Sequence, residues 1–250
     1  MTNIIVTGCS YSQISGVKEA YPNMLNTSPN LKVSNLAWPG QSNDTIIRNV
    51  KEQIREGVSD TLFICQLTHL HRISHYCTLN KKWLDFQPSI VNVQPSIKDD
   101  KVSFEIETMK DGNPSIGIYG AQVLSDNGLT NDELNRLFNW YEFYLTHLYD
   151  EENTFHELTH KINELTKQVK DSGNDILYLY WPDINYNDSL FSNNNFLSID
   201  GEYSMLKWSV KQKLTQPKDT HLTVDGHISI MREICKHLNI PVVPYRQPII

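Results

Sequence analysis

Short apolar runs alternate along the chain with stretches in which apolar residues recur every three or four positions. The runs are rich in β-branched and aliphatic residues, as strands buried in a parallel sheet are; they cover residues 4–6, 31–36, 61–65 and 175–180. The helical stretches cover residues 17–25, 44–56, 131–149, 153–169 and 226–238. Strands that alternate with helices build a parallel sheet with helices on both faces. We therefore expect an α/β fold, a flavodoxin-like three-layer sandwich with a mainly parallel sheet.

This alternation is interrupted between residues 76 and 130, where no helical periodicity is present. Within that segment residues 102–106 alternate between polar and apolar, and residues 116–118 can return after a turn, which predicts a β-hairpin. Residues 184–216 are polar and irregular. Because the segment 76–130 has no linker at either end, we expect one domain over residues 1–250 with this segment as an insertion.

The composition fits a globular protein with a packed core, since 39% of residues are hydrophobic and 10% are aromatic. With 22 basic and 29 acidic residues, the net charge of −7 is unlike that of proteins that bind phosphate backbones, so no nucleic-acid partner is expected. No apolar run approaches the roughly 20 residues that cross a bilayer, and the N-terminus lacks the basic region of a signal peptide. We expect no membrane partner and a cytoplasmic location. The four cysteines lack CxxC spacing, so reduced thiols and no metal site are expected.

A candidate nucleophile lies where the first predicted strand should end. Gly8-Cys9-Ser10 places a serine between strand and helix, and ligands of parallel α/β sheets bind at the carboxyl ends of the strands. A helix N-terminus at this point offers free N–H groups to a developing oxyanion. By itself the motif also fits a plain turn with a helix cap, and it does not decide between the two.

Motifs elsewhere in the chain produce a resemblance to a known family. Asp219-x-His221, followed by Gly226-His227 at the start of the last predicted helix, resembles the last conserved block of SGNH/GDSL hydrolases. Gly8-Cys9-Ser10 is similar to the first block, with Cys9 where many members have Asp, and residues 35–43 are similar to the second. The variant GCSYS combined with GxSN looks most like phage-type members. The resemblance covers the core of the sheet and not the insertion.

The resemblance implies a serine esterase with a Ser-His-Asp triad and with no cofactor. Ser10 would be the nucleophile, His221 would take its proton near neutral pH, and Asp219 would orient the imidazole. The N–H groups of Ser10 and Gly40 would bind the oxyanion. The implied substrate is a small-molecule or glycan ester, with O-acetyl groups on a glycan as one candidate. Acyl transfer by the same triad stays open.

The third block of the family, Gly-x-Asn-Asp, has no counterpart in this sequence. The third predicted strand is followed by Gln66 and Thr68 and by no asparagine, so one side-chain donor of the oxyanion hole is missing. Asn43 is the candidate in the neighbouring loop that could supply it and complete the oxyanion hole, or Gln66 or Thr68 could serve instead. Loss of one such donor typically costs about 2.7–4 kcal/mol. The candidate substrate-binding residues are Gln66, Thr68, Arg72 and Trp38. The gap keeps open a second hypothesis, an inactive SGNH-fold binding protein or a virion-associated structural protein.

Two alternatives concern histidines. Asp225-Gly226-His227 is a second Asp-x-His, but we favour His221 as the base because it lies in the loop before the helix. Residues 156–160 read HELTH, which matches the HExxH motif of zinc metalloproteases, a third hypothesis. The apolar stripe of that helix runs nearly opposite both histidines, so a solvent-exposed face is favoured over a zinc site. The stripe consists of Phe155, Leu158, Ile162, Leu165 and Val169.

Overall fold

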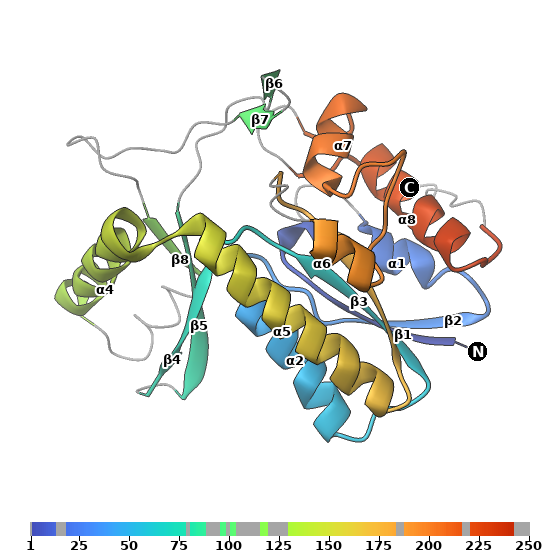
Figure 1. The fold of residues 1–250 in the computed structure, drawn as a ribbon, viewed down its shortest axis with the longest axis horizontal. Helices are drawn as coiled ribbons and strands as arrows, with labels where there is room; N and C mark the ends of the chain where they lie inside the picture. Colours follow the sequence, from blue (N-terminus) through green and yellow to red (C-terminus); the bar gives the residue numbers. More distant parts are fainter. Residues whose placement is uncertain are drawn as a thin grey trace.

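The computed structural model describes residues 2–13, 19–78, 81–88, 96–98, 101–103, 116–119, 130–183, 188–216 and 221–242. Four strands form a parallel sheet in the order β2-β1-β3-β9 (Figure 1). They are β1 (Thr2–Thr7), β2 (Leu31–Asn35), β3 (Thr61–Leu67) and β9 (Asp175–Tyr180). Each neighbouring pair is parallel, so all four strands end at the same edge. The four predicted strands and the α/β fold are confirmed.

Successive side chains of the inner strands enter two separate cores, one on each face of the sheet. In β3, Leu62 and Ile64 belong to one core, whereas Phe63, Cys65 and Leu67 belong to the other. The strands β1 and β9 divide their side chains in the same way. Because β3 is buried at every position, its sequence is a mostly apolar run and does not alternate.

Helices cover both faces of the sheet and complete the three layers (Figure 1). The helices α2 (Asn43–Arg55) and α5 (Glu151–Asp171) pack on one face, and α1 (Tyr21–Leu25) and α8 (Val224–His237) pack on the other. The predicted apolar stripe of α5 is confirmed, since all of its members are buried. Within the described ranges, no helix combines the length and the apolar character that crossing a bilayer requires.

The insertion forms a second, antiparallel sheet in the order β4-β5-β8. Its strands are β4 (Ile73–Cys77), β5 (Lys82–Pro88) and β8 (Ile116–Tyr119), while β6 (Ser96–Lys98) pairs with β7 (Lys101–Ser103). The expected β-hairpin-containing insertion is confirmed, but its described pairing differs from the prediction: residues 102–103 pair with β6 and residues 116–118 pair with β5, while residues 104–106 lie outside the described ranges. Alternation of side chains identifies a strand but leaves its partner undetermined, which explains the error.

Several helix ends differ from the prediction. The helix α4 (Asn131–Phe143) begins one residue after Thr130, whose hydroxyl accepts the N–H of Glu133 in a capping box. It continues as the π-helix η2 (Tyr144–Leu148), which we expected to be an ordinary helix. The helix α1 is shorter than predicted and starts at Tyr21, with Pro22 in its first turn.

Two helices lie in the stretch that we expected to be irregular. They are α6 (Asp188–Asn193) and α7 (Met205–Lys211), and α7 buries Met205, Leu206 and Trp208 in a core. A helix of two turns contains too few residues to display a periodic pattern, so its burial depends on the strands beside it.

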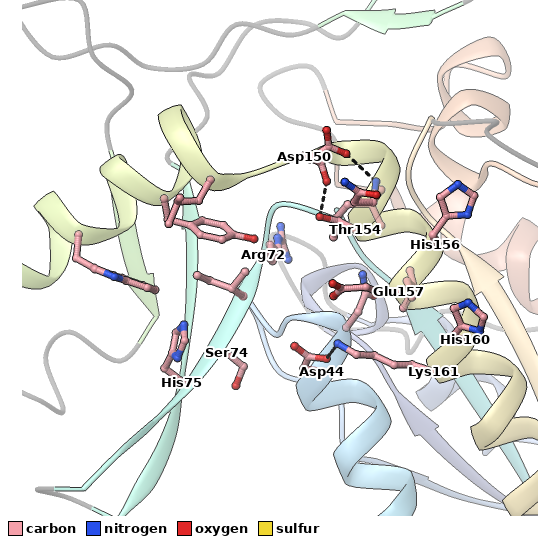
Figure 2. Close-up of a pocket in the computed structure, with 18 residues that line it drawn as sticks. Asp44, Arg72, Ser74, His75, Asp150, Thr154, His156, Glu157, His160 and Lys161 are labelled. Atoms are coloured by element: carbon pink, nitrogen blue, oxygen red, sulfur yellow. Dashed lines mark hydrogen bonds and ion pairs between the residues drawn. The ribbon is translucent and has the colours of Figure 1, made fainter.

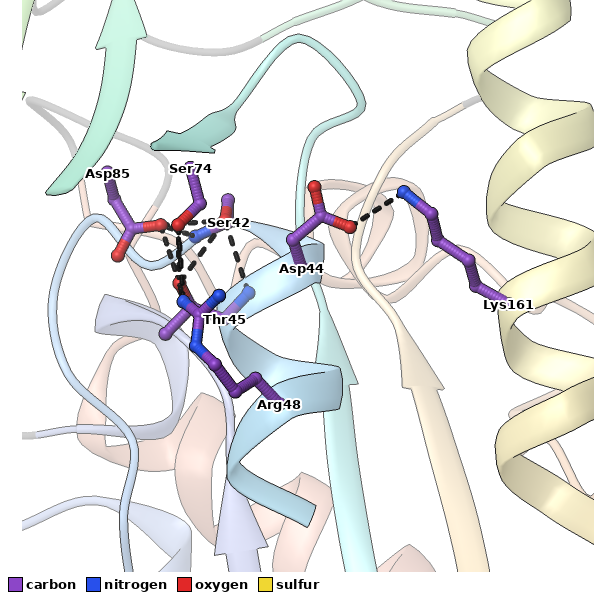
Figure 3. Close-up of polar contacts among 7 residues, drawn as sticks. All are labelled: Ser42, Asp44, Thr45, Arg48, Ser74, Asp85 and Lys161. Carbon is purple, nitrogen blue, oxygen red and sulfur yellow. Dashed lines mark hydrogen bonds and ion pairs between the residues drawn. The ribbon is translucent and has the colours of Figure 1, made fainter. Parts of the chain in front are cut away.

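Asp85 of β5 joins the second sheet to the start of α2 (Figure 3). Its carboxylate accepts hydrogen bonds from the N–H and hydroxyl groups of Ser42 (3.1 and 2.6 Å) and from the hydroxyl of Thr45 (2.8 Å). Arg48 donates to Thr45 and lies over the ring of Trp83, 3.8 Å from its centroid. These contacts hold the insertion against the loop that follows β2.

Candidate active site

The turn after β1 carries Ser10 at the carboxyl edge of the sheet. The turn is a short 3-10 helix, η1 (Ser10–Ser12), in which the N–H of Ser12 donates to the carbonyl of Cys9 (3.0 Å). Ser10 is 8% exposed. The predicted α-helix does not start here, so any oxyanion binding at this point depends on the N–H groups of a single turn.

Gln66 of β3 holds this turn in place. Its Oε1 accepts hydrogen bonds from the N–H and the thiol of Cys9 (3.1 and 3.3 Å) and from the hydroxyl of Ser12 (3.2 Å). Its Nε2 donates to the carbonyl of Leu67 (2.6 Å). A Cβ atom on Gly8 would lie only 2.9 Å from the Cβ of Gln66, so glycine is required for this close approach. Gln66 therefore positions the turn, and its side chain is committed to that role.

The loop after β2 lies beside the serine turn. The N–H of Trp38 donates to the carbonyl of Gly8 (3.2 Å), and the Trp38 side chain is 61% exposed. Gly40 has φ = 78°, a left-handed conformation that favours glycine. The loop thus carries an exposed aromatic ring and a conformationally special glycine next to the turn of Ser10.

Asn43 and Thr68 join the loops that follow β2 and β3. The Oδ1 of Asn43 accepts the N–H of Thr68 (2.8 Å), and its Nδ2 donates to the carbonyl of Thr68 (3.0 Å). Both residues are buried. The hydroxyl of Thr68 has no hydrogen-bond partner within the part of the chain that the structure describes. Of the three candidates for the missing donor, Thr68 is therefore the one whose side chain is not engaged there.

His221 lies at the same edge, in the loop before α8. Its carbonyl accepts the N–H of Gln216 (2.7 Å), which fixes the loop. Its ring centroid is 5.0 Å from that of Tyr11, and Tyr11 in turn stacks on Trp181 at 3.7 Å. Tyr11 was not predicted as a site residue, although its position directly after Ser10 is a signal for it. Through Tyr11, the structure brings His221 to the serine turn.

The structure describes two of the three residues of the predicted catalytic triad. No hydrogen bond joins Ser10 to His221 in the described ranges, and Asp219 lies outside them. Catalytic hydrogen bonds are often long in ligand-free enzymes and tighten when the substrate binds. Two of the three predicted triad residues therefore lie at one edge, and their roles stay predictions.

Comparisons with known proteins find similar folds. No family model and no curated protein matches the chain. A lipolytic protein of the GDSL family from Veillonella parvula has a TM-score of 0.48 and 9% identity, over 94% of this chain and 97% of that one. A catalytic mutant of Axe2, an acetylxylan esterase from Geobacillus stearothermophilus, has a TM-score of 0.42 and 11% identity, over 98% and 97%. A Bacillus subtilis protein has a TM-score of 0.48 and 12% identity over 95% of this chain, and this chain spans 56% of that protein's length. The likeness is one of fold.

His227, the alternative base, is packed inside the protein. It is 2% exposed, its Nδ1 accepts the N–H of Tyr21 (3.4 Å), and its ring lies nearly parallel to the Tyr21 ring. Burial, with a smaller contribution from His221, lowers the pKa of His227 to about 4. Because this ring is buried and already bonded to the backbone, the geometry favours His221 as the base.

Three basic residues follow β3. The imidazoles of His69 and His71 lie parallel, with their centroids 5.2 Å apart. Burial holds the pKa of His69 well below its usual value, helped by His71 and Arg72, and burial with the charge of Arg72 lowers the pKa of His71 to about 3. Both rings are therefore neutral at pH 7, and Arg72 carries the permanent charge of this group.

The HExxH motif lies on the solvent side of α5. His156, Glu157 and His160 are all exposed, and His156 lies 3.9 Å from the carboxylate of Glu152. The described residues contain no group of three His, Cys, Asp or Glu side chains placed to hold a metal ion. The predicted exposed face is confirmed.

The buried histidines predict acid sensitivity. His227 has a pKa of about 4 when folded and about 6.5 when unfolded, so in this interval the unfolded chain binds more protons. The unfolding free energy should therefore fall as the pH drops from about 6.5 towards 4, by on the order of 3 kcal/mol from His227. His69 acts in the same direction. Melting temperatures from pH 7 to 4.5 check this, and His227→Asn should flatten the slope; an unchanged slope would contradict the assignment to His227.

Proposed function

We propose that the chain is a serine hydrolase of the SGNH/GDSL type that cleaves carboxylic esters, with Ser10 as nucleophile and His221 as base. One observation carries the proposal. The Ser10 turn follows a central strand of the parallel sheet, and the ring of His221 lies against the ring of Tyr11 in that turn. The rigidity of the turn supports it, because Gln66 fixes the turn through three hydrogen bonds. A nucleophile must be held within a fraction of an ångström of its working geometry.

In the proposed reaction His221 takes the proton of the Ser10 hydroxyl as its oxygen attacks the ester carbonyl. The N–H groups of Ser10 and Gly40 stabilise the oxyanion that forms. The alcohol leaves with the proton held by His221, and an acyl-serine ester remains. A water molecule then gives its proton to His221 and attacks this ester. Ser10 leaves and takes the proton back from His221, and the acid is released. Asp219 orients the imidazole and stabilises its charged form.

The third oxyanion donor in this proposal is the hydroxyl of Thr68. It follows β3, where the family places its asparagine, and it makes no hydrogen bond in the described structure. Asn43 and Gln66 are already bonded to Thr68 and to the serine turn. An unpaired buried donor is available to a charge that appears only during the reaction.

Thr68→Val is expected to lower kcat for p-nitrophenyl acetate by about 10²-fold, because removal of one oxyanion donor has an effect of that size. The melting temperature should stay equal or rise, since valine has the shape of threonine and the hydroxyl is unpaired in the described structure. Asn43→Asp is the contrasting variant, because it breaks the hydrogen bond to the Thr68 carbonyl and should lower the melting temperature. An unchanged kcat in Thr68→Val would remove Thr68 from the oxyanion hole.

The substrate proposed is an acyl ester of a small molecule or glycan. Trp38, exposed beside the turn, offers a flat apolar surface for a sugar ring. Hydrolysis and acyl transfer share the same first half-reaction and differ in whether water or another alcohol accepts the acyl group. Product analysis in water with and without an added alcohol separates the two.

The test of the proposed function is covalent labelling with a fluorophosphonate, followed by peptide mapping. One adduct on Ser10 is expected, and the map must distinguish it from the neighbouring thiol of Cys9, which is fully buried. A folded protein that takes no label would refute the esterase proposal. The chain would then be a non-catalytic binding protein or a virion structural protein, as the absence of a third-block asparagine also favours.

A further inference from the structure

A pocket of about 690 Å³ lies between the second sheet and the helices of the main sheet. Its walls come from β4, from α4 and η2, from the start of α2 and from one side of α5 (Figure 2). Among the described residues, neither Ser10 nor His221 lines it, so it is distinct from the serine turn. Asn43 lines it and is also bonded to Thr68, so the pocket adjoins the candidate catalytic edge.

Arg72 forms part of the wall of this pocket. Figure 2 shows it between His75 of β4 and the side chains of α5. Arg72 is 8% exposed, and its Nε and Nη1 have no hydrogen-bond acceptor in the described structure. A guanidinium that is both charged and short of acceptors is costly inside a protein. The structure therefore holds a cation that lacks a partner beside a cavity large enough to admit one.

The acidic groups of the pocket are not placed to neutralise Arg72. Asp44 forms an ion pair with Lys161 (2.7 Å). Asp150 caps α5 by accepting an N–H of its first turn. Glu157 is exposed, and no ion pair joins it to Arg72 in the described ranges (Figure 2). Among the described residues of the pocket, no carboxylate therefore neutralises Arg72, so an anionic ligand could pair with it.

Another part of the pocket lining is aromatic. Trp140 is 39% exposed, and the ring of Tyr144 lies nearly parallel to it with centroids 6.1 Å apart. His75 meets Trp140 edge-on at 4.8 Å. An exposed indole held by neighbouring rings presents a rigid surface on which an apolar ring face can stack.

We propose that this pocket binds the carboxylate of a sugar acid, with the Arg72 guanidinium pairing the carboxylate and Trp140 stacking on the sugar ring. The planar fork of arginine matches the two oxygens of a carboxylate and binds them through two parallel hydrogen bonds. The proposal requires the Arg72 side chain, which lines the cavity, to turn its unpaired buried nitrogens towards the ligand. On the proposed esterase function, on which this substrate assignment rests, the sugar acid is a unit of a glycan ester.

Binding is tested with three probes of the same ring size: glucuronate, glucose 6-phosphate and glucose. Titrations followed by tryptophan fluorescence and by saturation-transfer NMR use the full chain and Ser10→Ala. Glucuronate is expected to bind at least about tenfold more tightly than glucose, since a charge-assisted pair contributes that much. Equal binding of glucuronate and glucose would overturn the proposal. Tighter binding of glucose 6-phosphate than of glucuronate would show that the pocket prefers a phosphate, and it would overturn the assignment to a carboxylate.

Arg72→Met separates a ligand-binding role from a structural one. Methionine removes the unpaired buried charge, so the ligand-free variant should melt about 2–4 °C higher while glucuronate binding is lost. The matched control is Arg48→Met, because Arg48 donates to Thr45 and Ser74 and its loss should lower the melting temperature. A lower melting temperature in Arg72→Met would show that Arg72 is structural and would overturn the proposal. Glu157→Gln should tighten glucuronate binding, since it removes a nearby negative charge.

The two proposals fail in different ways. Glucuronate binding that depends on Arg72 in a chain that takes no fluorophosphonate label would leave the pocket assignment intact and refute the esterase. Labelling of Ser10 in a chain that does not bind glucuronate would support the esterase and refute the pocket assignment.

Discussion

Ser10→Ala is expected to lower kcat for ester hydrolysis by about 10⁴-fold or more, the size of effect that follows loss of a serine nucleophile. The melting temperature should change little, because the hydroxyl is the only group removed and the backbone N–H groups of the turn remain. Steady-state kinetics with p-nitrophenyl acetate, together with thermal unfolding, check both statements.

Ser12→Ala is the matched control, since Ser12 lies in the same turn. Its hydroxyl bonds to Gln66 and to the hydroxyl of Tyr21 (2.8 Å), so its loss should cost stability, on the order of 1 kcal/mol, while fluorophosphonate labelling of Ser10 persists. Turnover retained in Ser10→Ala and lost in Ser12→Ala would move the nucleophile to Ser12.

His221→Ala is expected to reduce kcat by about 10³-fold or more, because without a base the serine hydroxyl keeps its proton. His227→Ala should instead act on stability, since it empties a buried site and leaves the N–H of Tyr21 without its acceptor. The comparison of kcat with melting temperature for the two variants distinguishes a base from a packing residue.

The reverse ranking would reassign the base to His227. In that case the structure would have to rearrange, because Nδ1 of His227 is bonded to Tyr21 and its ring is buried. His227→Asn tests the packing role by itself, because the asparagine Oδ1 can accept the same N–H. It should recover much of the stability lost in His227→Ala without changing kcat.

Local pattern predicted the central sheet but not the insertion. The strand at Thr61–Leu67 and the helix at Asn43–Arg55 show their type within their own residues, as a buried run and a helical stripe. The β5–β8 pairing joins segments that no local signal connects, and β5 itself was not predicted. Asp85, which attaches this sheet to α2, was missed for the same reason, since its partners at Ser42 and Thr45 are remote in sequence.

The sequence by itself determined the positions of the four strands of the parallel sheet and the candidates Ser10, His221 and Gly40, because periodicity and short motifs are properties of neighbouring residues. Only the tertiary structure decided which candidate side chains already form hydrogen bonds within the protein. Asn43 was the first candidate for the third oxyanion donor, with Gln66 and Thr68 as alternatives, until hydrogen bonds across 57 and 25 positions showed the side chains of Gln66 and Asn43 engaged. Likewise only the structure shows that Arg72, a candidate substrate-binding residue, is buried beside a cavity. Burial and hydrogen-bond partners depend on distant segments meeting in space, and a single sequence does not specify those meetings residue by residue.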